Sequence, residues 1–163
     1  SLICADKILS KYHSIISYAD ILYHKEAIEI LHNSKMKKGI VVLSFKHWKK
    51  YWKQRFKKPL LDLETFRTNS KNELVEIGNR TNSYKNIKGQ YMGVFKIDPY
   101  SWQKIKKYLI KDVDNLNKID ITALFQLIIK KKICNIYVEN YEKEWFEIDN
   151  IKDYKVLKKS IEN

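Results

Sequence analysis

The stretch Gly39-Ile-Val-Val-Leu-Ser-Phe45 is an almost unbroken run of apolar residues, most of them β-branched. A strand with one face in water would alternate apolar and polar residues, so this run predicts a strand deep inside a sheet and covered on both faces. Polar residues and glycines bound several shorter runs of apolar and aromatic residues, which predict further strands. These strands are expected at 14–20, 74–78, 90–97, 133–139 and 144–149.

Helical patterns alternate with these strands. Helices are expected over 1–11 and 25–33, and three more follow residues suited to helix starts. Asp98 precedes Pro99, Asp120 precedes an apolar segment, and Asn150 precedes the last helix. Alternation of strands and helices predicts the α/β class, with a mixed, mainly parallel sheet flanked by helices.

Length and composition favour one folded unit. The chain has 163 residues, of which 44% are hydrophobic, so we expect a single domain over residues 1–163. No run approaches the roughly 20 apolar residues of a membrane helix, and no secretory signal opens the chain, so a cytoplasmic protein without a membrane partner is expected. Cys4 and Cys134 lack zinc-ligand spacing, which favours ordinary thiols.

The net charge of +13 raises the possibility of a nucleic-acid partner. The segment 46–58 interleaves basic and aromatic residues, as single-strand-binding and membrane-surface segments do. It also places Trp48, Trp52 and Phe56 four residues apart, as expected of an amphipathic helix packed on a sheet. The amphipathic helix is preferred, because arginine, the usual ligand for phosphate, is scarce. A basic single-strand-binding module and an inactive truncated remnant stay open as alternatives.

Two aspartates close apolar runs that are far apart in the chain. Asp20 ends the first predicted strand, and Asp149 ends the last one. Carboxylates at strand ends lie where α/β sheets place their ligand crevice, and one or two carboxylates can hold Mg²⁺ together with substrate phosphates. Aspartate at a strand end is also common loop chemistry, and the residues alone favour that ordinary interpretation over a metal site, which stays open as the alternative.

Other candidate residues surround a bend marked by Pro59. Asp62 and Glu64 could face a cationic group on a substrate, with Trp48 or Trp145 as a cation–π wall. Lys96 could contact a phosphate or extend its charge into solvent at a strand end.

The four histidines are scattered, and no pairing of a nucleophile with a base can be recognised, so covalent catalysis is not indicated.

Taken in order, several segments resemble the carboxyl-terminal half of the nucleoside-triphosphate transferase family. This family comprises sugar-phosphate and phosphocholine nucleotidyltransferases, including small cytidylyltransferase-like members. The matching segments extend over nearly the whole chain and are Ser17-Tyr-Ala-Asp20-Ile, Arg55 with Pro59-Leu60 and Asp62-Leu-Glu64, Glu76-Ile-Gly78, Gly89-Gln-Tyr-Met-Gly93-Val-Phe-Lys96, Asp120-Ile-Thr-Ala-Leu-Phe-Gln126 and Trp145-Phe-Glu147-Ile-Asp149 with Asp153-Tyr154. The resemblance implies a partial nucleotide-diphospho-sugar transferase fold of the GT-A-like kind.

The resemblance also implies a reaction and its partners. A phosphate oxygen of a phosphorylated small molecule attacks the α-phosphorus of a nucleoside triphosphate, and pyrophosphate leaves. CMP is the expected transferred group. The expected acceptors are phosphocholine, a phosphonate, a phosphoamino compound or a sugar 1-phosphate, used in surface-polysaccharide biosynthesis.

By the same resemblance, Asp20 and Asp149 hold catalytic Mg²⁺, while Glu147 orients a metal-bound water or the substrate. The acceptor is expected to lie against Gly89 and Gly93, where the backbone can approach it closely. Three further residues are expected to bind substrate, namely Glu64, Lys96 and Trp145.

One part of the family pattern has no counterpart here. The family binds its nucleotide with a glycine-rich loop near the amino terminus, yet none of the four glycines precedes Gly39. We therefore expect the first half of the domain to be missing or to be a separate chain. On this expectation, the 163 residues do not provide the whole nucleotide site, and whether they are active alone stays open.

Overall fold

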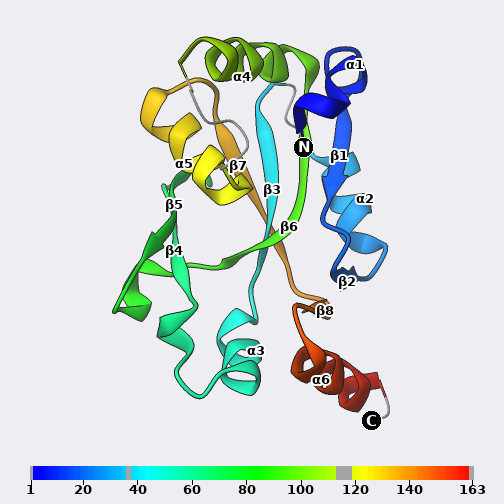
Figure 1. The fold of residues 1–163 in the computed structure, drawn as a ribbon, viewed down its shortest axis with the longest axis vertical. Coiled ribbons are helices and arrows are strands. Elements are labelled where there is room, and N and C mark those ends of the chain that lie inside the picture. The colour runs from blue at the N-terminus through cyan, green and yellow to red at the C-terminus, as the bar shows by residue number, and fades with distance from the viewer. Residues whose placement is uncertain (1, 36–37, 113–118, 162–163) are drawn as a thin grey trace.

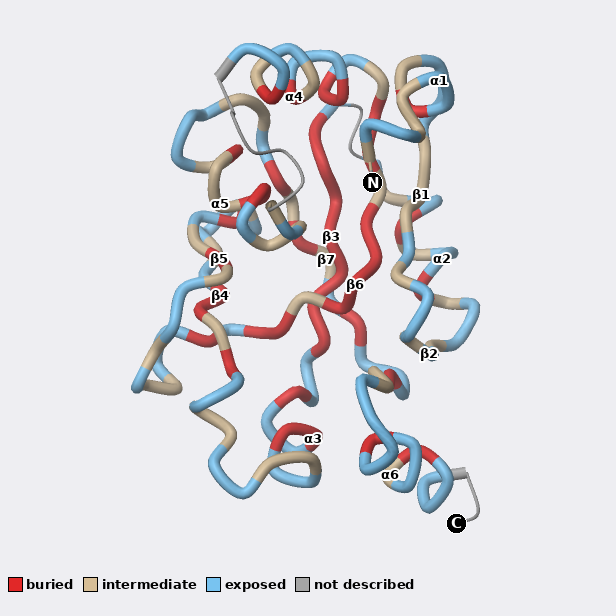
Figure 2. The backbone as a smooth tube through the Cα atoms, viewed as in Figure 1, coloured by how far each residue is buried: buried red, intermediate tan, exposed pale blue. Residues whose placement is uncertain are grey.

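The computed structural model describes residues 2–35, 38–112 and 119–161, and a four-stranded sheet forms its centre (Figure 1). The strand order is β1-β6-β3-β7. Their bounds are Ser14–Ser17 for β1, Gln90–Ile97 for β6, Ile40–Phe45 for β3 and Ile136–Tyr141 for β7. All six residues of β3 are buried, which confirms the prediction from its continuous apolar run (Figure 2).

The sheet is mixed, as expected, but the prediction that it is mainly parallel was wrong. β6 runs antiparallel to both β1 and β3, while β3 and β7 are parallel. The chain leaves β3, passes through α3 and a two-stranded hairpin, and returns as β6 in the opposite direction. A single crossover helix would have produced parallel pairing, and that connection is absent between these two strands.

Two smaller sheets flank the central one. β4 (Glu64–Thr68) pairs with β5 (Leu74–Arg80), and β2 (Ile21–Tyr23) pairs with β8 (Trp145–Glu147), both antiparallel. The sequence pattern predicted β5 and β8 but not β2 and β4. Asp20 consequently lies between two short strands, β1 and β2, instead of ending one longer strand.

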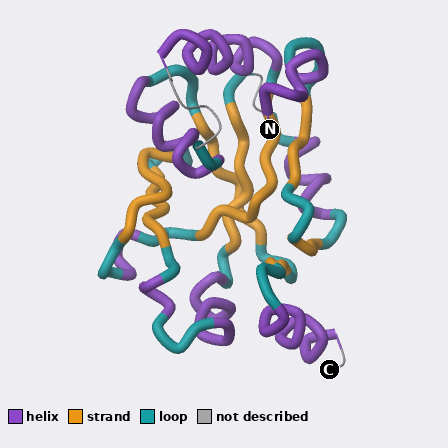
Figure 3. The backbone as a smooth tube through the Cα atoms, viewed as in Figure 1, coloured by secondary structure: helices purple, strands orange, loops and turns teal. Residues whose placement is uncertain are grey.

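The expected helices are present, and they lie both at the ends of the central sheet and along its sides, where α2 and α5 are found (Figure 1 and Figure 3). α4 crosses one end, whereas α3 and α6 lie at the opposite end (Figure 1). The first helix is shorter than expected and begins as a 3-10 turn, η1. The bounds are Leu2–Ala5 for η1, Asp6–Leu9 for α1, Glu26–Asn33 for α2, Trp48–Arg55 for α3, Pro59–Leu61 for η2, Tyr84–Asn86 for η3, Pro99–Asp112 for α4, Ile121–Lys131 for α5 and Ile151–Ile161 for α6.

Two of these helices bear on the sequence predictions. α3 buries Trp48 and Trp52, while Lys49, Lys50 and Lys53 are exposed, which confirms the amphipathic helix. Within the described residues, every helix is too short or too polar to cross a membrane.

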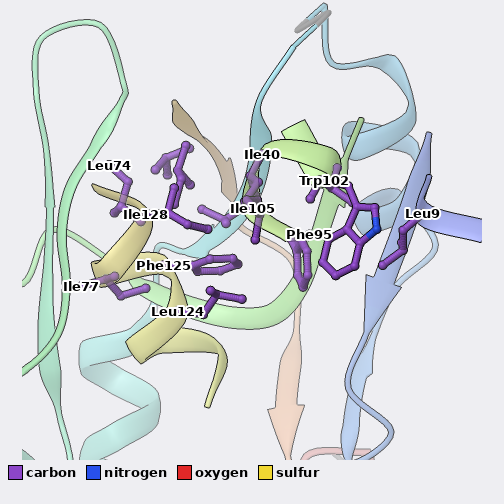
Figure 4. Close-up of a cluster of buried hydrophobic side chains, with 14 of the residues drawn as sticks. Leu9, Ile40, Leu74, Ile77, Phe95, Trp102, Ile105, Leu124, Phe125 and Ile128 are labelled. Atoms are coloured by element: carbon purple, nitrogen blue, oxygen red, sulfur yellow. The ribbon is translucent and has the colours of Figure 1, made fainter. Parts of the chain in front are cut away.

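Side chains of β3 alternate between two hydrophobic clusters. Ile40 and Val42 belong to a cluster with α4 and α5, in which the Phe95 and Phe125 rings meet edge to face at 5.2 Å (Figure 4). Val41 and Leu43 belong to the second cluster, which includes aromatic residues of α3 and β8. β3 is therefore part of both cores, and burial on both faces explains its sequence.

The start of α4 is tied to the start of β3 by one buried carboxylate. Asp98 accepts hydrogen bonds from the backbone N–H of Ser101 at 3.0 Å and of Gly39 at 2.6 Å. Gly39 adopts a φ of 123°, and a Cβ there would lie 2.7 Å from the Asn135 carbonyl oxygen. Burial acts to raise the Asp98 pKa, but the hydrogen bonds outweigh it and lower the pKa below its usual value.

We predict that Asp98→Ala lowers the free energy of unfolding by about 1–2 kcal/mol, because the helix cap and the bond to Gly39 are both lost. The folded-state pKa is lowered, so the carboxylate contributes stability above the unfolded-state pKa, and this contribution disappears as pH falls through the folded value. The difference from the wild-type chain in urea unfolding should therefore shrink on acidification. The exposed Glu142→Ala serves as the control, and an equal loss in both variants contradicts the assignment.

Candidate functional site

A cavity of about 260 Å³ lies where the β4–β5 hairpin, β6, α3 and β8 meet. Six of the candidate residues predicted from the sequence line it: Asp62, Glu64, Gly93, Trp145, Glu147 and Asp149. They come from segments far apart in the chain, so the fold brings together most of the predicted site.

Asp149 lines this cavity and Asp20 is outside its lining, but the two lie on adjacent segments of backbone. In the β2–β8 ladder Ile21 is opposite Glu147, and the Asp20 carbonyl accepts a hydrogen bond from the Ile148 N–H at 2.9 Å. The two aspartates are thus neighbours across a short antiparallel ladder. The Asp20 side chain is exposed, and it makes no hydrogen bond or ion pair with any residue that the structure describes.

Arg55, at the end of α3, contacts three carboxylates at once. Its Nη1 lies 2.9 Å from Glu147, its Nη2 2.8 Å from Asp149 and its Nε 2.8 Å from Asp153. The Arg55 side chain is only 1% exposed. Its guanidinium also lies over the rings of Tyr51, Trp52 and Phe56, at 5.1–5.8 Å from their centroids. Such planar, multiply bonded contacts suit arginine and could not be reproduced by lysine.

Burial and charge act in opposite directions within this cluster. Burial disfavours the Arg55 cation, but hydrogen bonds to Asp153 and Glu147 raise its pKa further above the usual range, so it stays charged. Burial raises the pKa of Glu147, aided by the nearby charges of Asp149 and Asp20 and opposed by Arg55. For Asp153, burial is outweighed by the Arg55 contact, and its pKa is lowered.

Two stacked indoles form an aromatic wall of the cavity. The rings of Trp52 and Trp145 lie 5.8 Å apart and nearly parallel, at 14°. Their N–H groups are bonded, Trp52 to Asp62 at 2.8 Å and Trp145 to the Met92 carbonyl at 3.0 Å. Of the two tryptophans suggested for a cation–π wall, Trp145 lines the cavity. Trp48 does not, because its ring packs against Tyr84.

The remaining predicted residues differ in their placement. Gly93 adopts a φ of 77°, and a Cβ there would lie 2.9 Å from the Tyr18 ring, so the close approach that it permits is to Tyr18. A Cβ at Gly89 would collide with Ser44, and Gly89 does not line the cavity. Lys96 lies outside the lining as well, and its ammonium donates to the His32 carbonyl at 3.1 Å.

Arg55 is the residue of this site that was missing from the predicted set. It was recognised only as part of a motif beside Pro59. The sequence does carry a signal for the importance of Arg55. Arginine is rare in this lysine-rich chain, and a rare arginine indicates a position where the planar guanidinium, which can form several hydrogen bonds at once, is needed. Its partners, however, lie 92–98 residues away in the sequence.

We predict that Arg55→Ala lowers the free energy of unfolding by about 3–5 kcal/mol, because buried Asp153 and half-buried Glu147 lose their cation. Arg67→Ala is the matched control, since Arg67 pairs with Glu76 in a largely exposed position, and should cost at most about 1 kcal/mol. Chemical unfolding measured by circular dichroism tests both variants. Equal losses in the two arginine variants would contradict a buried Arg55 network.

Comparison with known proteins identifies related sequences and folds. No protein-family model matches the chain. It is 32% identical over 153 residues to the CTP:phosphoglutamine cytidylyltransferase of Campylobacter jejuni, covering 90% of this chain and 59% of that protein. The chain therefore spans somewhat more than half the length of this relative.

Solved structures show the same fold. The inositol-1-phosphate CTP transferase of T. maritima superimposes with a TM-score of 0.67 at 17% identity, covering 97% of this chain and 60% of that one. The CTP:phosphocholine cytidylyltransferase of Streptococcus pneumoniae gives 0.57 at 14% identity, covering 98% and 61%. In sequence this chain is thus similar to a cytidylyltransferase, and in fold to solved nucleotidyltransferases, as the resemblance of its motifs predicted.

Proposed function

We propose that this chain forms part of a nucleotidyltransferase that transfers CMP from CTP to a phosphorylated small molecule. The observation that carries the proposal is the backbone adjacency of Asp20 and the segment of Asp149, which lines the cavity, in a chain similar to a cytidylyltransferase. In this reaction an oxygen of the acceptor phosphate attacks the α-phosphorus, and pyrophosphate leaves. The protein supplies no nucleophile, so positioning and charge stabilisation account for catalysis.

The 163 residues are proposed to be the carboxyl-terminal part of the transferase domain. They cover 59% of the Campylobacter relative and contain no glycine-rich loop before Gly39. The nucleotide's phosphates would then be gripped mainly by a segment outside these residues, either in a longer chain or in a separate one. The chain itself contributes the acceptor side of the site.

Asp20 and Asp149 are proposed to hold Mg²⁺. Their donor set fits, because both offer carboxylate oxygens: the Asp20 side chain makes no hydrogen bond or ion pair with a residue that the structure describes, and only one oxygen of Asp149 is bonded to Arg55. Within the described residues no group of three or more acidic, histidine or cysteine side chains could hold a metal. Two carboxylates suffice when phosphates complete the coordination. Bound Mg²⁺ would neutralise charge on the reacting phosphates.

Arg55 is proposed to be a positioning residue. It bonds one carboxylate oxygen of Asp149 and one of Glu147, which fixes both side chains so that their other oxygens stay at the cavity wall. Glu147 would orient a water or the substrate next to the metal site. Glu64, Gly93 and Trp145 would contact the acceptor, because all three line the same cavity. The product, a CMP-activated compound, suits surface-polysaccharide biosynthesis, as the family resemblance implies.

We predict that Asp20→Asn or Asp149→Asn lowers turnover by at least about 100-fold, because each removes a charged metal ligand. The measurement is Mg²⁺-dependent pyrophosphate release from CTP with a panel of phosphorylated acceptors. It is made on the 163-residue chain and on the complete reading frame that encodes it. Chelation of Mg²⁺ should stop the reaction.

Glu142→Gln is the control, since Glu142 is exposed and does not line the cavity. Full activity of both aspartate variants would refute the metal assignment. Salt-sensitive binding of single-stranded oligonucleotide, unaffected by Mg²⁺ and by either aspartate, would instead favour the binding module built on the lysines of α3.

A further inference from the structure

Exposed lysines concentrate at the end of the molecule where α3 and α6 lie (Figure 1). The segments 46–58 and 151–161 together carry ten lysines, all of them exposed, and a single acidic residue, Asp153. The Asp153 carboxylate is buried and bonded to Arg55, so it does not offset the charge at the surface. None of these lysines lines the candidate cavity. This end of the molecule therefore presents positive charge that the proposed reaction does not use.

The lysines of α3 adjoin the surface of α6. A shallow depression of about 430 Å³ lies on α3, and lysines together with one histidine form its lining, namely Lys46, His47, Lys49, Lys50 and Lys53. A second depression, of about 310 Å³, shares His47 and Lys50 with the first and extends to Ser160 in α6. Glu142 and Glu144 also line the second depression, so positive charge is densest on the α3 side. The two helices thus form one continuous surface.

The outer face of α6 combines lysine with exposed apolar side chains. Ile151 is 71% exposed and Tyr154 is 51% exposed, although both are large. Tyr154 and Lys155 lie three and four residues after Ile151, so the three side chains share one face of the helix. The opposite face is buried at Asp153 and Leu157. Apolar residues among lysines on an exposed helix face are typical of helices that lie on anionic membranes.

Single-stranded nucleic acid is another polyanion that a lysine-rich surface attracts, and its bases stack on exposed aromatic rings. The rings of α3 do not serve this purpose, because Trp48, Tyr51 and Trp52 are at most 7% exposed. Arg55, the arginine of α3, is bonded to three carboxylates. Lysine acts as a flexible point charge, which suits mobile lipid headgroups that require no fixed geometry. The surface therefore fits a lipid headgroup layer better than a nucleic-acid strand.

We propose that the end of the molecule formed by α3 and α6 binds the anionic surface of a lipid bilayer, with its lysines at the headgroups and Ile151 and Tyr154 at the boundary with the acyl chains. The expectation that the protein has no membrane partner rested on the lack of a membrane-spanning segment, which surface binding does not require. Binding at this surface leaves the lining of the candidate cavity uncovered by lysines and goes beyond the proposed transferase.

Vesicle co-sedimentation of the 163-residue chain tests the proposal. Vesicles of phosphatidylcholine with about one third phosphatidylglycerol should retain the chain at least about tenfold more strongly than vesicles of phosphatidylcholine alone, because each lysine near an anionic surface adds attraction. Retention should weaken as salt is added, since salt screens exposed charges. The assay requires neither nucleotide nor acceptor.

Two double variants of equal charge locate the binding surface. Lys50→Gln combined with Lys53→Gln should lower the partition coefficient for anionic vesicles at least about fivefold, because both lysines lie on the exposed face of α3. Lys107→Gln combined with Lys111→Gln is the matched control. These two lysines are exposed on α4, at the opposite end of the molecule, and their loss should change the coefficient by less than about twofold (Figure 1).

A second pair of variants tests the apolar contact. Tyr154→Ala should lower the partition coefficient at least about threefold, because a ring at the headgroup boundary contributes apolar burial. Tyr100→Ala is its matched control, since Tyr100 is 53% exposed on α4, against 51% for Tyr154 on α6. The control should bind anionic vesicles as the wild-type chain does.

Equal retention by neutral and anionic vesicles overturns the proposal. An equal loss in the two double-lysine variants also overturns it, because binding would then follow the net charge of the protein and not this surface. The same holds for an equal effect of the two tyrosine variants. If a single-stranded oligonucleotide displaces the chain from anionic vesicles at matched phosphate concentration, the surface belongs to nucleic acid and the bilayer is wrong.

Discussion

The buried guanidinium of Arg55 is the interaction on which the arrangement of the site depends. One side chain, almost completely removed from solvent, joins the end of α3 to Glu147 on β8, to Asp149 after it and to Asp153 in α6. The buried Asp153 and the half-buried Glu147 carboxylates would be unfavourable without a cation, and the cation would be unfavourable without them. The end of the molecule that carries α3 and α6 (Figure 1) is therefore held together by charge as well as by the hydrophobic cluster that includes the aromatic residues of α3 and β8.

The same cluster explains how acidic residues can gather in a protein with so much positive charge. Arg55 compensates the carboxylates nearest the proposed metal site, and Asp20 approaches from β2 through a backbone ladder. Lysines lie on the exposed face of α3, away from the cavity lining. Negative and positive side chains are thus separated in space: the carboxylates line the cavity, and the lysine ammonium groups of α3 lie in solvent. A metal ion is a species that such a cavity attracts.

Much of this architecture could be predicted from local sequence. The continuous run of β3, the Asp98-Pro99 start of α4 and the Asp120 cap of α5 are signals carried by neighbouring residues, and all three are confirmed. β2 was missed because three residues are too short to show a period. The direction of β6 was missed because strand direction depends on the path of the intervening chain, which no local pattern encodes.

The candidate site divides in the same way. The sequence by itself determined that Asp20 and Asp149 stand at the ends of apolar segments, and that Glu64 and Trp145 are of suitable chemistry, because residue type and spacing are local properties. Only the tertiary structure decided that Glu64, Trp145 and Asp149 share one cavity, that the Asp20 backbone lies next to that of Ile148, and that Arg55 bonds two carboxylates of the cavity. Arg55 and its partners are separated by more than 90 residues, and their contact depends on the packing of α3 against β8 and α6. Pairing over such a separation is set by the fold, which is why residue chemistry was predictable and its electrostatic balance was not.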